Sequence, residues 1–94
     1  MRFEWDAAKN EINRRKHGIR FEIAVEVFDD PMAVNLLDRV MDGEERWQRI
    51  GLVRDRRLVV VAHTFRDNFG EEITRIISAR KANPKERRLY EEDE

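Results

Sequence analysis

The sequence predicts an α+β fold in which helices pack on an antiparallel sheet in two layers. Apolar residues recur at helical spacing in the first third of the chain, apolar runs typical of strands fill the middle, and a helix-start signal lies near the end. The 94 residues predict a single domain, 1–94, because domains of this size are common and chains under ~150 residues rarely hold two. An apolar fraction of 40% is enough for a core.

The beginning of the chain predicts two helices. Residues 2–5 place two aromatic side chains at period two, which fits either a small strand or an aromatic anchor. Asp6 suits an N-cap and Gly18 a C′ position, so a helix of about eleven residues is expected between them. A second helix is expected at about 20–28, where apolar residues form one stripe, and Pro31 disfavours its continuation.

The middle of the chain predicts a sheet. Four strands are expected, at 33–37, 45–53, 57–65 and 73–79. The third contains Val59–Val61 and is nearly continuous in apolar residues, which is typical of a central strand covered on both faces. Residues 38–44 are expected to form a loop, and Asp55-Arg56 and 67–72 to form turns, although the former lacks the Asp-Gly that suits a tight hairpin.

The last element is expected to be a helix from Pro84 to about Glu92. Asn83 is the N-cap, Pro84 occupies the first helical position, and Glu86 follows three residues after the cap. This capping-box pattern contributes roughly 1 kcal/mol to helix stability. The helices and the roughly four-stranded antiparallel sheet complete the predicted two-layer architecture.

Composition excludes several kinds of chemistry. Cys is absent, so a disulfide framework, a thiolate zinc site and a Cys nucleophile are excluded. His17 and His63 have no partner at metal-ligand spacing, and Ser78, the only serine, lacks a nucleophile-elbow motif. No cofactor or metal is therefore expected. No apolar run of about 18 residues and no signal peptide is present, so a cytoplasmic protein without membrane contact is expected.

The charges are balanced overall but unevenly distributed. The chain carries 19 basic and 20 acidic residues. Basic residues gather at 9–20 and 75–88, and acidic residues at 21–45. Most of the basic residues are Arg, whose fork of donors fits phosphate. The pattern favours RNA contact on one face, with a basic partner segment competing from the other; a solvated, salt-bridged surface is the alternative.

Cleavage of RNA by its own 2′-hydroxyl fits this residue set, because it needs only a base, an acid and cations. Alternation along 57–65 predicts that His63 and Arg66 point to opposite faces unless a bulge intervenes. Arg66 and Arg80 are expected to face a shared cleft. His63 also fits a hydrogen-bonded core histidine, and His17 fits a partner of the last carbonyls of its helix.

Residue patterns along nearly the whole chain resemble the BrnT family of toxins. They include Phe3-Glu4-Trp5-Asp6, Lys16-His17-Gly18 with Phe21-Glu22, Asp30-Pro31, His63-Thr64 with Arg66, and Arg-Ile-Ile-Ser-Ala-Arg at 75–80. The resemblance implies a RelE-like ribonuclease fold and the toxin half of a type II toxin–antitoxin pair that cleaves RNA and inhibits translation. The segment Asp67–Thr74 looks longer than is usual in the family and adjoins the expected cleft.

The residues and the resemblance together give a set of candidate site residues. The expected catalytic residues are His17, His63, Arg66 and Arg80, and the expected RNA-binding residues are Lys9, Arg14, Lys16 and Arg75. The resemblance implies a BrnA-type antitoxin as partner, typically in a heterotetramer that contacts operator DNA only through the antitoxin. The alternative function is a non-catalytic RNA- or protein-binding module that acts in operon autoregulation.

Overall fold

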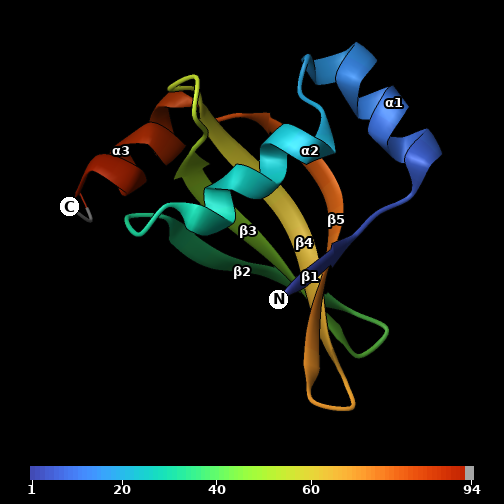
Figure 1. Ribbon diagram of the computed structural model, residues 1–94. Helices are drawn as coiled ribbons and strands as arrows, with labels where there is room; N and C mark the ends of the chain where they lie inside the picture. The colour runs from blue at the N-terminus through green and yellow to red at the C-terminus, as the bar shows by residue number, and fades with distance from the viewer. Residues whose placement is uncertain (93–94) are drawn as a thin grey trace.

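The computed structural model describes residues 1–92 and shows an α+β arrangement with a five-stranded mixed sheet (Figure 1). Its elements are β1 (Arg2–Glu4), α1 (Ala7–His17), α2 (Phe21–Ala24), the 3₁₀ helix η1 (Val25–Asp29), β2 (Val34–Met41), β3 (Glu44–Leu52), β4 (Leu58–Asn68), β5 (Glu71–Lys81) and α3 (Pro84–Glu92). The strand order is β1-β5-β4-β3-β2, and β1 runs parallel to β5 while the other neighbours are antiparallel.

The four expected strands form an antiparallel meander, β2 to β5, and the first residues of the chain add a fifth strand that is parallel to β5. Phe3 pairs in register with Thr74. Its ring also contacts the Phe28 ring, with centroids 5.1 Å apart, so the segment is both a strand and an aromatic anchor. The aromatic pattern at 2–5 allows a strand, but its pairing with β5, about 70 residues away, has no local signal in the sequence.

The N-terminal helices form where expected. The Asp6 carboxylate accepts a hydrogen bond from the Lys9 backbone N–H at 3.0 Å, and Gly18 ends α1 with φ of +72°. The second helix consists of two short pieces, α2 and η1, and the backbone is extended at Asp30, before Pro31.

The loop expected at 38–44 is wrong, because β2 and β3 continue through it as strands. Only Asp42-Gly43 connects them, with φ of +52° and +77°. Phe69-Gly70 connects β4 and β5 in the same way, with φ of +53° and +84°. Positive φ at both central residues is typical of a type I′ hairpin. The long 67–74 segment is therefore a strand extension with a tight turn.

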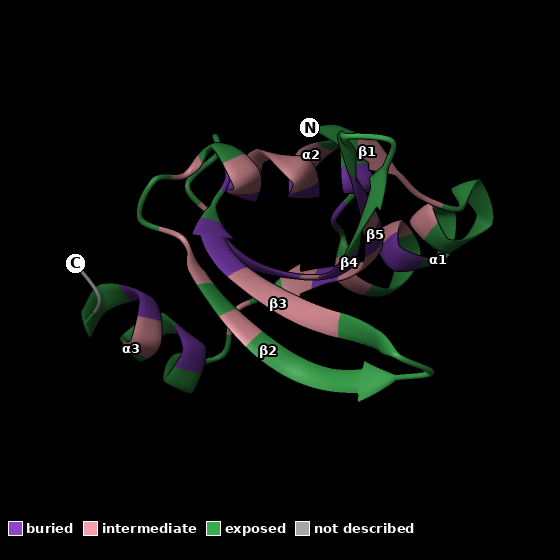
Figure 2. Cartoon of the chain, turned by 90° about the horizontal axis from the view of Figure 1, so that it is seen from below, coloured by how far each residue is buried: buried purple, intermediate pink, exposed green. Residues whose placement is uncertain are grey.

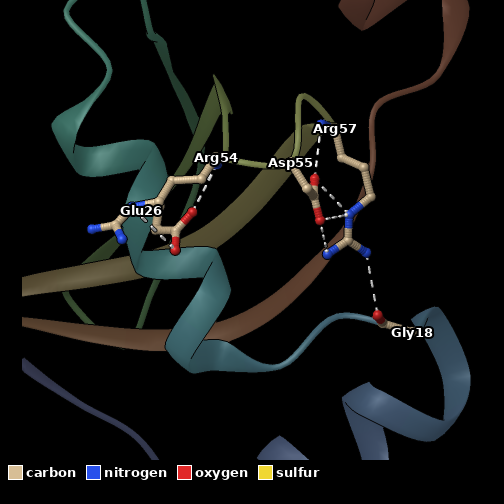
Figure 3. A network of polar contacts seen from close by, with 5 residues as sticks. All are labelled: Gly18, Glu26, Arg54, Asp55 and Arg57. Atoms are coloured by element: carbon tan, nitrogen blue, oxygen red, sulfur yellow. Dashed lines mark hydrogen bonds and ion pairs between the residues drawn. The ribbon is translucent and has the colours of Figure 1, made fainter.

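The turn between β3 and β4 lacks Asp-Gly, and Arg56 takes the left-handed conformation with φ of +72°. Figure 3 shows how its neighbours are held. The Asp55 carboxylate accepts hydrogen bonds from the Arg57 backbone and guanidinium at 2.8–3.0 Å. Arg57 also donates to the Gly18 carbonyl at 3.3 Å, and the Arg54 backbone N–H donates to Glu26 at 2.8 Å. The turn is thereby joined to α1 and η1.

The predicted two-layer arrangement is wrong, because helices cover both faces of the sheet, α2 and η1 on one and α3 on the other (Figure 2). We call these the α2 face and the α3 face. Val59 and Val61 pack under α2, whereas Leu58 and Val60 pack against Tyr90 of α3. Strand β4 is therefore covered on both faces at its start, as predicted. Figure 2 also shows that the outer ends of β2 and β3 are exposed, so neither layer extends over the whole sheet.

The capping box of α3 is confirmed. The Asn83 side chain accepts a hydrogen bond from the Glu86 N–H at 2.8 Å, and the Glu86 carboxylate accepts one from the Asn83 N–H at 2.9 Å. The Tyr90 hydroxyl donates to Asp30 at 2.7 Å, which attaches the last turn of α3 to the residue that ends η1.

Candidate functional site

Strand alternation separates the candidate residues of β4. His63 lies on the α2 face with Val61, and Arg66 lies on the α3 face with Thr64. The pairing of β4 with β5 is irregular between Ala62 and His63, because Ala62 pairs with Ser78 and His63 pairs with Ile76. The unpaired residue, Ile77, therefore belongs to β5 and not to β4. The alternation along β4 is therefore intact, and the prediction that His63 and Arg66 point in opposite directions is confirmed.

A carboxylate lies between two arginines on the α3 face, away from α3. Arg66 donates to both carboxylate oxygens of Glu4, one of them at 3.1 Å, and the Arg75 guanidinium lies 3.8 Å from the same carboxylate. Glu4 pairs in register with Arg75, which pairs with Thr64 of β4. The side chain of Glu4 is 25% exposed, against 51% for Arg66 and 42% for Arg75. The three charged groups are therefore accessible together.

The ion pairs of this cluster stabilise the charged forms of its side chains. Hydrogen bonding from Arg66 lowers the pKa of Glu4, with further lowering by the nearby positive charge of Arg75. The same hydrogen bond raises the pKa of Arg66. Glu4 is therefore ionised near neutral pH, so the cluster offers a proton acceptor beside two fixed cations.

More arginines share this open part of the α3 face. Arg39 of β2 and Arg46 of β3 are register partners, and alternation along β3 and β4 places them on the same face as Thr64. We call this surface the arginine face: Arg2, Glu4, Arg39, Arg46, Arg66 and Arg75. It crosses all five strands at the end of the sheet that α3 leaves uncovered. Guanidinium groups arranged in this way suit the phosphates of an extended nucleic-acid strand.

His63 lies in the core. Its exposed fraction is 0%, and its ring stands edge-on to Phe28 and Phe65 with centroids 4.9 and 4.7 Å away. Its Nδ1 lies 3.2 Å from the Val61 carbonyl oxygen. Burial lowers the pKa of the imidazole, which favours the neutral ring. The structure favours the core interpretation of His63 and places the ring out of reach of the arginine face.

The structure does not bring Arg66 and Arg80 into one cleft. Arg80 is on the same face but pairs with Val60, six residues along β4 from Arg66, which corresponds to roughly 20 Å. Its guanidinium donates to both oxygens of Glu86, at 2.7 and 2.8 Å. This bond raises the pKa of Arg80. Arg80 thus joins β5 to the first turn of α3.

Helix α1 lies along β5 where β1 ends, and one buried side chain holds it there. The Asn13 amide donates to the Ile19 and Ala79 carbonyls at 2.8 and 2.9 Å, and its oxygen accepts from the Ala79 N–H at 3.1 Å. Asn13 thereby pairs with β5 as a neighbouring strand would. The position of α1 beside the sheet follows from this contact.

Three of the predicted residues of α1 line a hollow of about 190 Å³ against β5. They are Lys9, Lys16 and His17, and Ile77 and Ser78 form part of the opposite wall. Within residues 1–92 their side-chain nitrogens make no hydrogen bond or ion pair. Ser78 pairs with Ala62 on the α3 face, so the hollow adjoins the arginine face.

Arg14 differs from these residues, because its guanidinium is already bound. It donates to both oxygens of Glu11, at 2.6 and 3.0 Å. This bond, with the neighbouring charge of Arg14, lowers the pKa of Glu11 to about 2. Arg14 is therefore less suited to binding RNA than Lys9 or Lys16.

Comparison with known proteins identifies the family. Residues 5–86 match the family model described as the ribonuclease toxin BrnT of type II toxin–antitoxin systems. The chain belongs to the BrnT family. Membership makes it a ribonuclease toxin, with RNA as its target and an antitoxin as its partner. A search of curated proteins found no match.

Sequence reasoning missed Glu4, Arg39 and Arg46 as candidate site residues of this BrnT-family chain. Glu4 is significant only once residues 2–4 are known to pair with β5. Arg39 was assigned to a loop, where its face is undefined. The Asp-Gly pair at 42–43 is the signal that could have placed it, since Asp-Gly between strands predicts a two-residue hairpin.

Two further observations concern the described part of the chain. Among residues 1–92, no group of three or more His, Asp or Glu side chains is placed to hold a metal ion. No helix in this range is long and apolar enough to cross a membrane.

Proposed function

We propose that this BrnT-family chain is a metal-independent endoribonuclease that cleaves RNA on the arginine face and thereby inhibits translation. The observation that carries the proposal is the Glu4 carboxylate held between Arg66 and Arg75 on an open sheet face. It supplies a base and two cations, which are the groups that cleavage by the 2′-hydroxyl requires. Family membership supports the activity, and the geometry of the cluster supports this location for it.

The proposed reaction is an internal transesterification. Glu4 accepts the proton of the 2′-hydroxyl, and the 2′-oxygen attacks the adjacent phosphorus. The bond from phosphorus to the 5′-oxygen breaks, giving a 2′,3′-cyclic phosphate and a 5′-hydroxyl that takes its proton from water. Arg66 and Arg75 neutralise the charge that develops on the phosphorane oxygens. Binding of the phosphate to these arginines also weakens their hold on Glu4 and frees it to accept the proton.

The helix α1 extends this site along the RNA. Ser78, beside His17, lies three residues from Arg75 on β5, which corresponds to roughly 10 Å. This separation supports a position for Lys9, Lys16 and His17 beside the neighbouring nucleotides of a strand whose cleaved phosphate is at Glu4. We assign to them a role in holding RNA, and we assign to Arg80 and His63 roles in packing.

The test is incubation of the purified, antitoxin-free chain with RNA in EDTA, followed by analysis of the new ends. We expect cleavage with 2′,3′-cyclic phosphate and 5′-hydroxyl termini. Intact RNA in the presence of folded protein would refute the activity. Cleavage that stops in EDTA and returns with added Mg²⁺ would refute the metal-independent mechanism.

A second candidate function is RNA binding without cleavage. It is favoured by one observation, that Glu4 is already bound by Arg66 in the free chain. The lysines of α1, which have no bound partner within residues 1–92, would then serve binding alone. A steep fall of RNA affinity with salt, without formation of product, would favour this function over the first.

The partner is proposed to be a BrnA-type antitoxin that forms a heterotetramer with this chain in the cytoplasm and alone contacts operator DNA. The arrangement of helices on both faces of a sheet supports the RelE-like assignment. Co-purification with the protein encoded beside this gene, followed by measurement of the molar mass of the complex, tests the stoichiometry. A mass corresponding to one copy of each protein would contradict it.

A further inference from the structure

The two faces of the sheet carry opposite charge beyond the helices. On the α2 face, the exposed acids at the outer ends of the strands are Glu45, Asp67 and Glu72. Asp67 pairs with Glu72, and Glu45 lies on β3 two residues before Trp47, which pairs with His63. The same strands carry the arginine face on their other side. At these strand ends the α2 face carries acids without exposed bases among the described residues, whereas the other side carries five arginines against Glu4, Glu44 and Glu71.

Among the described residues, Arg49 is the only cation at this end of the α2 face, and its guanidinium is already hydrogen-bonded. Arg49 donates to the Val27 and Asp30 carbonyls at 2.9 and 3.3 Å and to Asn35 at 3.1 Å. Its guanidinium also lies over the Phe28 ring, 5.2 Å from the centroid. Arg49 thus belongs to the packing under η1, and the surface beyond it is acidic.

Exposed apolar side chains lie among these acids. Leu37 is 50% exposed, Val40 58% and Phe65 40%, although all three lie on strands. Leu37 pairs with Trp47, and Val40 pairs with Glu45, so they share the α2 face. A pocket of about 340 Å³ opens here, lined by Asp42, Gly43, Glu44, Glu45, Trp47 and Phe65. We call this region the acidic–aromatic patch: Leu37, Val40, Glu45, Trp47, Phe65, Asp67 and Glu72.

The chemistry of the patch selects its occupant. Aromatic rings next to carboxylates bind a Lys or Arg side chain, through the ring faces and by charge attraction. The exposed Leu37 and Val40 require apolar partners in addition. RNA phosphates would be repelled by the acids. A segment with alternating cationic and apolar side chains fits these requirements.

We propose that the acidic–aromatic patch is the surface on which the antitoxin docks, through a cationic, amphipathic segment that places a basic side chain between Trp47 and Phe65. Family membership supplies the antitoxin partner, and the proposal rests on the proposed function only in taking the RNA site to be on the opposite face. It anchors the antitoxin on the sheet face opposite the proposed RNA site. The antitoxin then reaches the arginine face around the exposed edge strand β2.

The test titrates the purified antitoxin encoded beside this gene into the full chain. Glu45→Lys with Glu72→Lys reverses the charge of the patch at two exposed residues that make no hydrogen bond or ion pair within residues 1–92. Glu91→Lys with Glu92→Lys is the matched control on α3, with an equal change in net charge. We expect the first pair to weaken binding by about tenfold or more and the control by less than about twofold.

A spectroscopic readout locates the contact. The chain has two tryptophans, and Trp5 packs edge-on against Phe21 in the core region. In the Trp5→Phe variant, emission therefore reports Trp47 alone. We expect the emission to shift to shorter wavelength when the antitoxin binds, because the exposed side of the indole becomes covered.

The proposal is overturned if both double variants weaken antitoxin binding equally or if neither weakens it. It is also overturned if Trp47 emission does not change when the antitoxin binds. If the patch variant melts well below the unmodified chain, Val40→Lys replaces it, since Val40 is 58% exposed and packs little. RNA cleavage is measured separately without antitoxin. If the unmodified chain does not cleave RNA, the proposed activity is refuted. The binding titration still tests the docking surface in that case, because it does not depend on cleavage.

Discussion

Glu4 is the residue on which the proposed chemistry depends. We expect Glu4→Gln to slow RNA cleavage by about 100-fold or more, the usual contribution of a general base. RNA affinity should remain or increase, because a negative charge is removed from beside Arg66 and Arg75. Single-turnover cleavage and filter binding measure the two quantities. Glu71→Gln is the control, since Glu71 forms an exposed ion pair with Arg2 on the same face. Equal losses in both variants would count against a base at Glu4.

The pH dependence of cleavage distinguishes Glu4 from a histidine base. Hydrogen bonding from Arg66 lowers the pKa of Glu4, so the carboxylate becomes protonated only below its ordinary value of about 4.3. The rate should therefore stay level through pH 5 to 6 and fall in more acidic solution. A histidine base would lose its activity near pH 6.5. In Arg66→Ala, the acid limb of the residual activity should move to higher pH, because the stabilising hydrogen bond is lost.

At the scale of the element, α3 depends on one charged contact with the sheet. Glu86 is only 8% exposed and accepts two hydrogen bonds from Arg80. Arg80→Ala should lower the free energy of unfolding by about 1–2 kcal/mol, since it leaves a largely buried carboxylate without its cation, with partial screening at the exposed Arg80 side. Thermal melting measures the loss, with Lys81→Ala as control. A loss of cleavage without a change in melting would instead favour the catalytic role that the sequence predicted for Arg80.

The hairpin between β4 and β5 contains a residue ill-suited to its conformation. Phe69 has φ of +53° and an exposed fraction of 104%, so its side chain gains nothing from packing. Asn tolerates the left-handed region better and is favoured in type I′ turns. We expect Phe69→Asn to stabilise the domain by about 0.5–1 kcal/mol, measured by denaturant unfolding. Gly70→Ala, at φ of +84°, should do the reverse, although nothing obstructs its Cβ. Destabilisation by Phe69→Asn would show that the ring makes a contact in solution.

The helices were predictable because their signals are local. Asp6, Gly18, Asn83 and Glu86 act through hydrogen bonds within a few residues of the chain. The outer ends of the strands were not predictable from periodicity, because both of their faces meet solvent and apolar alternation is lost there. The parallel pairing of β1 joins residues about 70 positions apart. Glu4 was missed as a candidate site residue for that reason, whereas Arg66 and Arg75 lie in segments that resemble the BrnT family and were candidates on that ground.

At the scale of the whole molecule, the distribution of charge follows strand alternation rather than position in the sequence. The basic block at 9–20 is partly neutralised within α1, where Glu11 binds Arg14 and Arg15. In the block at 75–88, Arg80 is bound by Glu86. The expectation that the faces differ in charge is supported, but the sorting occurs within β2 to β5, where neighbouring residues belong to opposite surfaces. Adding up the charges of consecutive residues cannot detect this difference between the two faces of the sheet.

This sorting predicts which arginines bind RNA. Arg39→Ala with Arg46→Ala removes two cations from the arginine face, and Arg87→Ala with Arg88→Ala removes two exposed cations from α3, inside the basic block of the sequence. The plot of log affinity against log salt for single-stranded RNA should lose about 1.4 units of slope in the first variant, at about 0.7 for each phosphate contact. The second variant should keep the slope of the unmodified chain, because Arg87 and Arg88 lie outside the arginine face. The reverse result would show that RNA follows the basic block of the sequence and crosses α3, and it would move the proposed site away from Glu4.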